Sequence, residues 1–158
     1  MNLLDIIVVG GGPSGLAAAI AAQKAGLDYQ VLEKGVLVNS IFHFPSDMVF
    51  FTTPELLEIG GIPFTTPYQK PTRMEALRYY RRVSDAYQLR VSLNQEVISI
   101  ARQNGSAQNG AVFAVETRGS NGSGAVHHGR TVVVATGYYD HPNRLGIPGE
   151  DPPHVRHQ

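Results

Sequence analysis

The residues that could bind a ligand are concentrated near the N-terminus of this 158-residue chain. Gly10, Gly12 and Gly15 form a Gly-x-Gly-x-x-Gly spacing directly after the apolar residues 6–9. Gly10 permits a sharp turn, Gly12 lets a diphosphate approach the backbone, and Gly15 lets a helix pack closely on a strand. The diphosphate would lie on the free amide N–H groups of the helix N-terminus. The motif predicts a dinucleotide site.

The residues around this turn support that interpretation. A small-residue helix is predicted over 13–25, with Pro13 in its first turn and Gly26 as its stop, followed by a strand over 29–33. Glu33 ends this strand, about 20 residues after the turn, where an acidic side chain would hold a free ribose. The alternative is a glycine turn that merely opens an ordinary parallel α/β unit, because a chain with 17 glycines can contain such a hexapeptide by chance.

Composition limits the class of protein. The 13 basic and 13 acidic residues leave no net charge, so electrostatics predicts neither nucleic acid nor anionic lipid as a partner. With no cysteine, the chain has no disulfide, thiolate metal site or redox cysteine pair of its own. No run approaches the roughly 18 apolar residues of a membrane span, and a signal-peptide pattern is missing. We therefore expect one cytoplasmic domain without a membrane partner.

Periodicity predicts the other elements. A strand over 5–9 is apolar on both faces, and a helix over 73–87 places Leu77, Tyr80, Val83 and Tyr87 on one face. The remaining expected elements are a strand over 89–93, a hairpin of 95–100 with 111–117, a segment over 125–128 and a β-branched strand over 131–137. The opposite face of the helix carries three arginines, interpreted as a solvated surface, with a phosphate site as the alternative: Arg78, Arg81 and Arg82.

Residues 34–71 lack periodicity and contain five prolines, yet they are rich in aromatic residues. Buried rings argue against disorder, so we expect this long segment to cover a flat, partly apolar ligand. The alternative is a loop that only seals the core. A metal site built from His141, His154 and His157 is set aside, because these histidines have no carboxylate or thiol partner at suitable spacing.

Three features together resemble a known group of proteins: the glycine turn with Glu33, the meander that begins at residues 96–97, and the strand 131–137 followed by residues 145–150. They are similar to the FAD domain of the two-dinucleotide-binding-domain flavoproteins, the thioredoxin reductase and flavin monooxygenase relatives. Within that group, residues 33–35, 38–41 and 50–53 look like the YpdA family of bacillithiol disulfide reductases.

This resemblance implies an α/β fold, a Rossmann-like FAD-binding domain with a parallel central sheet, helices on one side and a three-stranded antiparallel β-meander on the other. The domain would occupy residues 1–140, and 141–158 would be a Pro-rich crossover linker towards an NAD(P)H domain absent from the sequence. Carried over by position, the pyrophosphate would lie at Gly12, Pro13, Ser14 and Gly15, the adenosine ribose at Glu33, and the adenine beside the backbone of Val97. The loop from Asn39 to Thr52 would approach the flavin ring, and Ala135, Thr136 and Gly137 would pass beside the cofactor. Gly10 and Lys34 complete the expected cofactor-binding residues.

The chain departs from the family in two respects. Many members have a cysteine at the position of Ser14, and a serine hydroxyl cannot perform thiol–disulfide exchange. Ser14 is therefore expected to lie near the pyrophosphate at a helix N-terminus. No second glycine fingerprint follows residue 137, so we expect the N-terminal part of a longer protein, without a nicotinamide site of its own.

Two functions follow from these features. The first is the FAD-binding part of an oxidoreductase that passes electrons from NADPH, through the flavin, to a small disulfide or similar acceptor. The second is a stand-alone module that binds an ADP-containing nucleotide without redox activity. No residue is a convincing catalytic acid, base or nucleophile. The oligomeric state that we consider for this protein is a homodimer.

Overall fold

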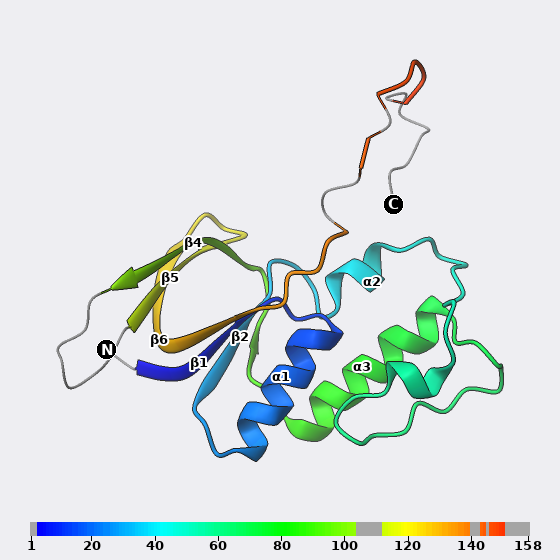
Figure 1. Cartoon of the computed structure of the whole chain (residues 1–158), viewed down its shortest axis with the longest axis horizontal. Helices are drawn as coiled ribbons and strands as arrows, with labels where there is room; N and C mark the ends of the chain where they lie inside the picture. Colours follow the sequence, from blue (N-terminus) through cyan, green and yellow to red (C-terminus); the bar gives the residue numbers. More distant parts are fainter. Residues whose placement is uncertain (1–2, 104–111, 140–142, 145, 151–158) are drawn as a thin grey trace.

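The computed structural model describes residues 3–103, 112–139, 143–144 and 146–150 (Figure 1). Its elements follow the order that the sequence predicts, with two short helices added. They are β1 (Leu3–Val9), α1 (Pro13–Lys24), β2 (Tyr29–Leu32), α2 (Asn39–His43), the 3₁₀ helix η1 (Pro54–Leu57), α3 (Arg73–Tyr87), β3 (Val91–Ser92), β4 (Gln95–Gln103), β5 (Val112–Gly119) and β6 (Gly124–Val134).

One six-stranded sheet runs through the molecule in the order β3-β2-β1-β6-β5-β4. The pairs β3–β2, β2–β1 and β1–β6 are parallel, whereas β6–β5 and β5–β4 are antiparallel. β6 belongs to both parts, since its first half pairs with β5 and its second half pairs with β1. The predicted meander and the predicted parallel sheet are therefore joined through one long strand.

The two faces of the central strands have different covers. On one face, Val8 and Val31 pack against Ala19 and Ala22 of α1, whose small side chains let the helix lie close to the sheet. On the other face, Ile7 packs in a separate cluster with Val115 of β5. Figure 1 shows α1 and α3 on one side and the β4–β5 ribbons on the other. The predicted layering, with helices on one side and the meander on the other, is confirmed.

α3 has the bounds that the sequence predicts. A reciprocal capping box starts it: Glu75 N–H donates to the Thr72 hydroxyl, and Thr72 N–H donates to the Glu75 carboxylate. The face with Ala76, Tyr80 and Val83 is buried against α1 and the segment before α3. The three arginines that we assigned to a solvated surface are exposed, as predicted: Arg78, Arg81 and Arg82.

Some boundaries differ from the prediction. Residues 125–128 and 131–134 form one strand, and this strand ends at Val134 instead of residue 137. The physical reason is that β1 ends at Val9, whose carbonyl accepts the last ladder hydrogen bond, from Ala135 N–H. β3 has two residues, where the sequence predicts five. The residues predicted as irregular, 34–71, contain α2 and η1, which are too short to produce a periodic signal.

Part of the predicted organisation falls on residues that the structure does not describe. Most of the linker predicted over 141–158, and the hairpin turn at 104–110, lie outside the described residues. Within the described ranges, no helix is long and apolar enough to cross a membrane.

Candidate functional site

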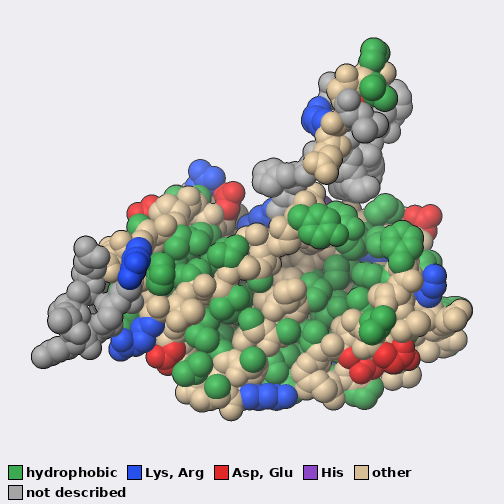
Figure 2. All heavy atoms as spheres, viewed as in Figure 1, with side chains coloured by type: hydrophobic (Ala, Val, Ile, Leu, Met, Phe, Trp, Pro, Cys, Tyr) green, Lys and Arg blue, Asp and Glu red, His purple; other side chains and the backbone are tan. Residues whose placement is uncertain are grey.

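A cleft of about 1210 Å³ opens at the carboxyl ends of β1, β2 and β6. At this point β1 is paired with β2 on one side and with β6 on the other, which is where open α/β sheets bind ligands. Figure 2 shows hydrophobic side chains gathered around a hollow on this face of the molecule. The cleft is therefore the first place to look for the predicted ligand.

The glycine turn after β1 forms the floor of the cleft. Gly10 has φ +108°, and a Cβ atom there would lie 2.4 Å from the carbonyl oxygen of Ala135. A Cβ atom at Gly15 would lie 1.9 Å from the carbonyl oxygen of Gly10. A Cβ atom at Gly12, by contrast, would meet nothing within 4 Å. Gly10 thus makes the sharp turn and Gly15 the close packing, whereas Gly12 leaves its backbone open to the cleft.

Glu33 fixes this turn from the neighbouring strand. Its side chain is buried, and its two carboxylate oxygens accept hydrogen bonds from Gly11 N–H at 2.6 Å and Gly35 N–H at 2.9 Å. Charge-assisted bonds of this kind offset the loss of water around a buried carboxylate. Val38 N–H donates to the carbonyl of Gly11 at 3.0 Å. The Gly11 residue is therefore held at both its N–H and its C=O by the segment that follows β2.

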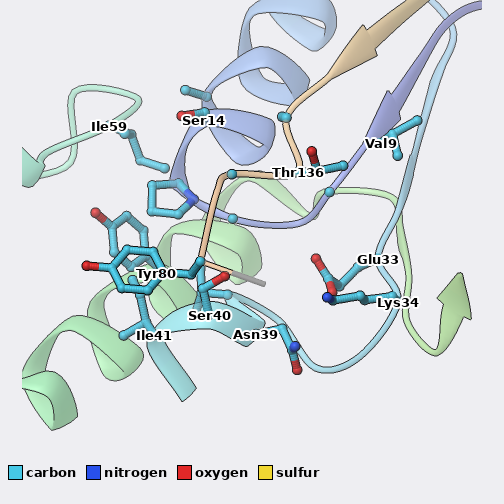
Figure 3. Close-up of a pocket in the computed structure, with 18 of the residues that line it drawn as sticks. Val9, Ser14, Glu33, Lys34, Asn39, Ser40, Ile41, Ile59, Tyr80 and Thr136 are labelled. Atoms are coloured by element: carbon cyan, nitrogen blue, oxygen red, sulfur yellow. The ribbon is translucent and has the colours of Figure 1, made fainter. Parts of the chain in front are cut away.

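The cleft has two chemically different ends (Figure 3). The polar end contains Glu33, Lys34 and Asn39. The opposite end, here called the apolar end, contains Ile41 and the residues Leu57, Ile59 and Tyr80. In this view Ser14 of α1 is drawn on the side of Ile59, and Thr136, from the chain after β6, on the side of Glu33. An elongated ligand with one polar and one apolar end would match this arrangement.

Aromatic rings border the apolar end. The rings of Phe44 and Tyr139 both line the cleft and contact each other, with centroids 4.8 Å apart, and Phe44 also contacts Phe50 edge-to-face at 6.3 Å. Thr52 lies in the same lining, and its hydroxyl oxygen is buried without a hydrogen-bond partner among the described residues. An unpaired buried hydroxyl is uncommon, so this atom fits a polar group on a ligand that is otherwise apolar here.

The cleft brings together the predicted cofactor contacts from five separate stretches of sequence. All of them except Gly15 line it: Gly10, Gly12, Pro13, Ser14, Glu33, Lys34, Asn39, Thr52, Val97, Ala135, Thr136 and Gly137. Gly15 lies instead below the turn, against Gly10. That these residues contact a cofactor stays a prediction.

Sequence reasoning missed the wall formed by Leu57, Ile59 and Tyr80. Tyr80 was assigned to the buried face of its helix, which is correct, but its second role in lining the cleft has no signal in a helical pattern. Leu57 and Ile59 lie in a stretch without periodicity, and only tertiary contacts bring them to the cleft.

No group of histidine, acidic or cysteine side chains in the described part of the chain could hold a metal ion. The three histidines considered as ligands, His141, His154 and His157, lie outside the described residues.

Comparison with known proteins identifies the family. The family described as pyridine nucleotide-disulphide oxidoreductase matches residues 7–158. The chain belongs to this family. Bacilliredoxin reductase Bdr from Bacillus subtilis (strain 168) is 43% identical over 151 residues, which are 96% of this chain and 44% of that protein.

Two solved structures extend this likeness. Bacillithiol disulfide reductase Bdr (YpdA) from Bacillus cereus matches with a TM-score of 0.86 and 42% identity, over 95% of this chain and 44% of that one. The Staphylococcus aureus protein of the same name matches with a TM-score of 0.83 and 36% identity, over 97% of this chain and 44% of that one. The predicted fold class and the predicted resemblance to the YpdA family are confirmed. The chain spans less than half the length of these relatives.

Proposed function

We propose that this chain is the FAD-binding part of a pyridine-nucleotide-dependent flavoprotein oxidoreductase. One observation carries the proposal: a single cleft joins an open glycine turn and a buried glutamate to an end bordered by aromatic rings. ADP would fill only the polar end and the turn. A dinucleotide with a large, flat ring system fits the whole cleft.

The polar end suits the adenosine and diphosphate of FAD. The open backbone at Gly12 and the exposed hydroxyl of Ser14, in the first turn of α1, would receive the diphosphate. Each carboxylate oxygen of Glu33 accepts one backbone N–H and keeps a second lone pair, so Glu33 can also accept a ribose hydroxyl. The backbone near Val97 would lie beside the adenine.

The apolar end suits the flavin ring. Apolar and aromatic side chains there would exclude water from a bound ring, and the unpaired hydroxyl of Thr52 would bond to one of its polar atoms. Bound FAD supplies hydride and electron transfer chemistry. The contribution of this chain is to bind the cofactor, orient it and shield it.

For the whole protein we propose reduction of a low-molecular-weight disulfide or similar acceptor, with NADPH as electron source, in the cytoplasm. The names of the Bacillus and Staphylococcus relatives support the disulfide acceptor. In this arrangement residues 1–140 form the FAD-binding domain, 141–158 lead towards an NAD(P)H domain, and two copies form a homodimer. Because residue 14 is a serine, we assign it to the diphosphate and not to thiol exchange.

Calorimetric titration of the purified 158-residue chain with FAD, ADP and NAD tests the proposal. A flavin domain binds FAD more tightly than the other two, because only FAD places a ring in the apolar end. Equal affinity for all three would instead support the stand-alone nucleotide-binding module. No binding of FAD at all would overturn the proposal.

A further inference from the structure

One part of the wall at the apolar end is held in place by hydrogen bonds from a neighbouring helix. Residues 57–62, here called the 57–62 turn, contribute Leu57, Glu58 and Ile59 to the lining of the cleft. Its own backbone hydrogen bonds are long: Glu58 N–H reaches Glu55 at 3.4 Å, and Ile62 N–H reaches Ile59 at 3.3 Å. Such distances correspond to weak bonds, so the turn depends on other contacts for its position.

Three tyrosines of α3 supply most of these contacts, and one more is the Phe64 N–H, which donates to the Glu58 carboxylate at 2.9 Å. The Tyr80 hydroxyl donates to the carbonyl of Leu57 at 3.0 Å. The Tyr79 hydroxyl accepts from Ile59 N–H at 2.8 Å and donates to the carbonyl of Ile62 at 2.8 Å.

The third tyrosine is Tyr87, whose hydroxyl donates to the carbonyl of Gly60. Gly60 is pressed against that ring, since a Cβ atom at Gly60 would lie 2.8 Å from Tyr87 Cε2. The turn is thus fastened to one helix through the backbone of four of its residues, Leu57, Ile59, Gly60 and Ile62.

Rings complete this support. Phe64, just after the turn, stacks on Tyr79 with centroids 4.4 Å apart, and Tyr79 meets Tyr80 edge-to-face at 5.1 Å. Burial raises the pKa of Tyr80 and of Tyr79, so both hydroxyls stay protonated at ordinary pH and remain donors. Replacing one hydroxyl with hydrogen would leave a backbone group of the turn without its partner, with little change in side-chain volume.

The polar end is held by different hydrogen bonds. The bonds that hold Gly11 come from Glu33 and Val38, and none of them involves the 57–62 turn or the three tyrosines. Val38 does pack in the same apolar cluster as Tyr79 and Tyr80, so the two ends share side-chain contacts but no hydrogen bond. Loosening the turn therefore acts first on the wall of the apolar end.

We propose that Tyr79, Tyr80 and Tyr87 are positioning residues that make the cleft selective for a nucleotide carrying an apolar ring over ADP. They do so by fixing the 57–62 turn against the apolar end. The inference rests on the proposed function. Of the three, only Tyr80 itself lines the cleft, so Tyr87 acts on ring binding indirectly, through the turn that its hydroxyl holds.

The test compares FAD and ADP affinities, measured by calorimetry, and the visible absorption spectrum of bound FAD. The variants are Tyr80→Phe and Tyr87→Phe, with Tyr68→Phe, whose side chain is exposed, as matched control. We expect each of the first two to weaken FAD binding about three- to tenfold, which is the size of one lost hydrogen bond. ADP binding should change by less than about twofold, because ADP does not reach the apolar end. The spectrum of bound FAD shifts in both, and Tyr68→Phe behaves as wild type.

The outcomes separate the two proposals. A wild-type chain that does not prefer FAD overturns the proposed function. A wild-type chain that prefers FAD, with Tyr87→Phe unchanged in FAD affinity and spectrum, overturns this inference alone. Equal losses of FAD and ADP affinity in Tyr80→Phe and Tyr87→Phe also overturn it, since they indicate general damage to the fold. ADP binding retained in each variant shows that the variant is folded.

Discussion

The polar and apolar ends of the cleft are built in opposite ways. At the polar end, the turn, its glutamate and the bonds between them lie within residues 10–38, in one βαβ unit. At the apolar end, the lining comes from α2, the 57–62 turn, α3 and the chain after β6. The first end is specified by backbone geometry, the second by side chains that join distant segments.

This contrast has a physical origin. A diphosphate binds backbone N–H groups, whose placement requires glycine at particular turn positions. A flat ring requires a shaped apolar wall, which many residue types can form and which any rigid support can hold. The support here is α3, which fastens the 57–62 turn through tyrosines and α2 through Arg73. The Nε atom of Arg73 donates to the carbonyl of Ile41 at 3.1 Å.

The largest expected effect comes from Gly15→Ala, which introduces a steric clash at the most tightly packed position of the polar end. The new methyl group would lie 1.9 Å from the carbonyl oxygen of Gly10, so helix and strand must separate. We expect a loss of about 3 kcal/mol in the free energy of unfolding, measured with urea.

Gly12→Ala is the matched control for this variant, because its methyl group would meet nothing within 4 Å and the φ of Gly12 is −78°. Its stability should stay within about 0.5 kcal/mol of wild type. Equal destabilisation by both substitutions would contradict the assignment of different roles to the two glycines.

Glu33→Gln is expected to have the next largest effect. An amide can accept only one of the two N–H groups, so either the buried Gly11 N–H or the partly buried Gly35 N–H loses its partner. The free energy of unfolding should fall by about 2 kcal/mol even without ligand. FAD and ADP should lose affinity to the same extent in calorimetry, because both use this end.

The exposed Glu116→Gln serves as control for that experiment. If Glu33→Gln left the ligand-free protein as stable as wild type, Glu33 would serve the ribose alone and not the turn.

Glu75→Gln addresses the helix that supports the apolar end. Hydrogen bonds from Thr72 N–H and the Thr66 hydroxyl hold the pKa of Glu75 below its ordinary value of 4.5. Because the folded-state pKa is lowered, this stabilisation is present above about pH 4.5 and is lost as the pH falls through the lowered pKa. Substitution should cost about 1 kcal/mol at neutral pH, the size of a helix cap.

Thermal unfolding across the acidic range checks this. The difference in stability between wild type and Glu75→Gln should shrink as the pH falls below the lowered pKa. In calorimetry at neutral pH, the Glu75→Gln variant should lose more affinity for FAD than for ADP. A difference that does not change with pH would show that the Glu75 charge does not contribute.

Ser14→Ala is expected to have the smallest effect. The hydroxyl is exposed in the first turn of α1, so stability should change by less than about 0.5 kcal/mol. FAD and ADP should both bind about two- to threefold more weakly, because each carries the diphosphate that the hydroxyl would contact. A loss confined to FAD would place Ser14 with the apolar end instead.

The sequence predicted the fold and the backbone geometry of the glycine turn with few errors, for reasons visible at particular residues. Gly10 needs a positive φ, Gly15 allows no Cβ atom, and Glu33 follows at a fixed distance along one βαβ unit, so the pattern is local. Long apolar strands and the helix over 73–87 also repeat with clear periods. The length of β6 was missed because its end depends on where β1 stops.

The apolar end could be predicted only as a region. Aromatic residues in 34–71 indicated a cover for a flat ligand, but Leu57, Ile59 and Tyr80 gave no local sign that they meet in one wall. The sequence alone determined the turn that suits a diphosphate and the glutamate beside it, because glycine conformation and βαβ spacing are local properties. The tertiary structure decided how the apolar end is built, because Leu57, Ile59 and Tyr80 meet only where the 57–62 turn packs against α3.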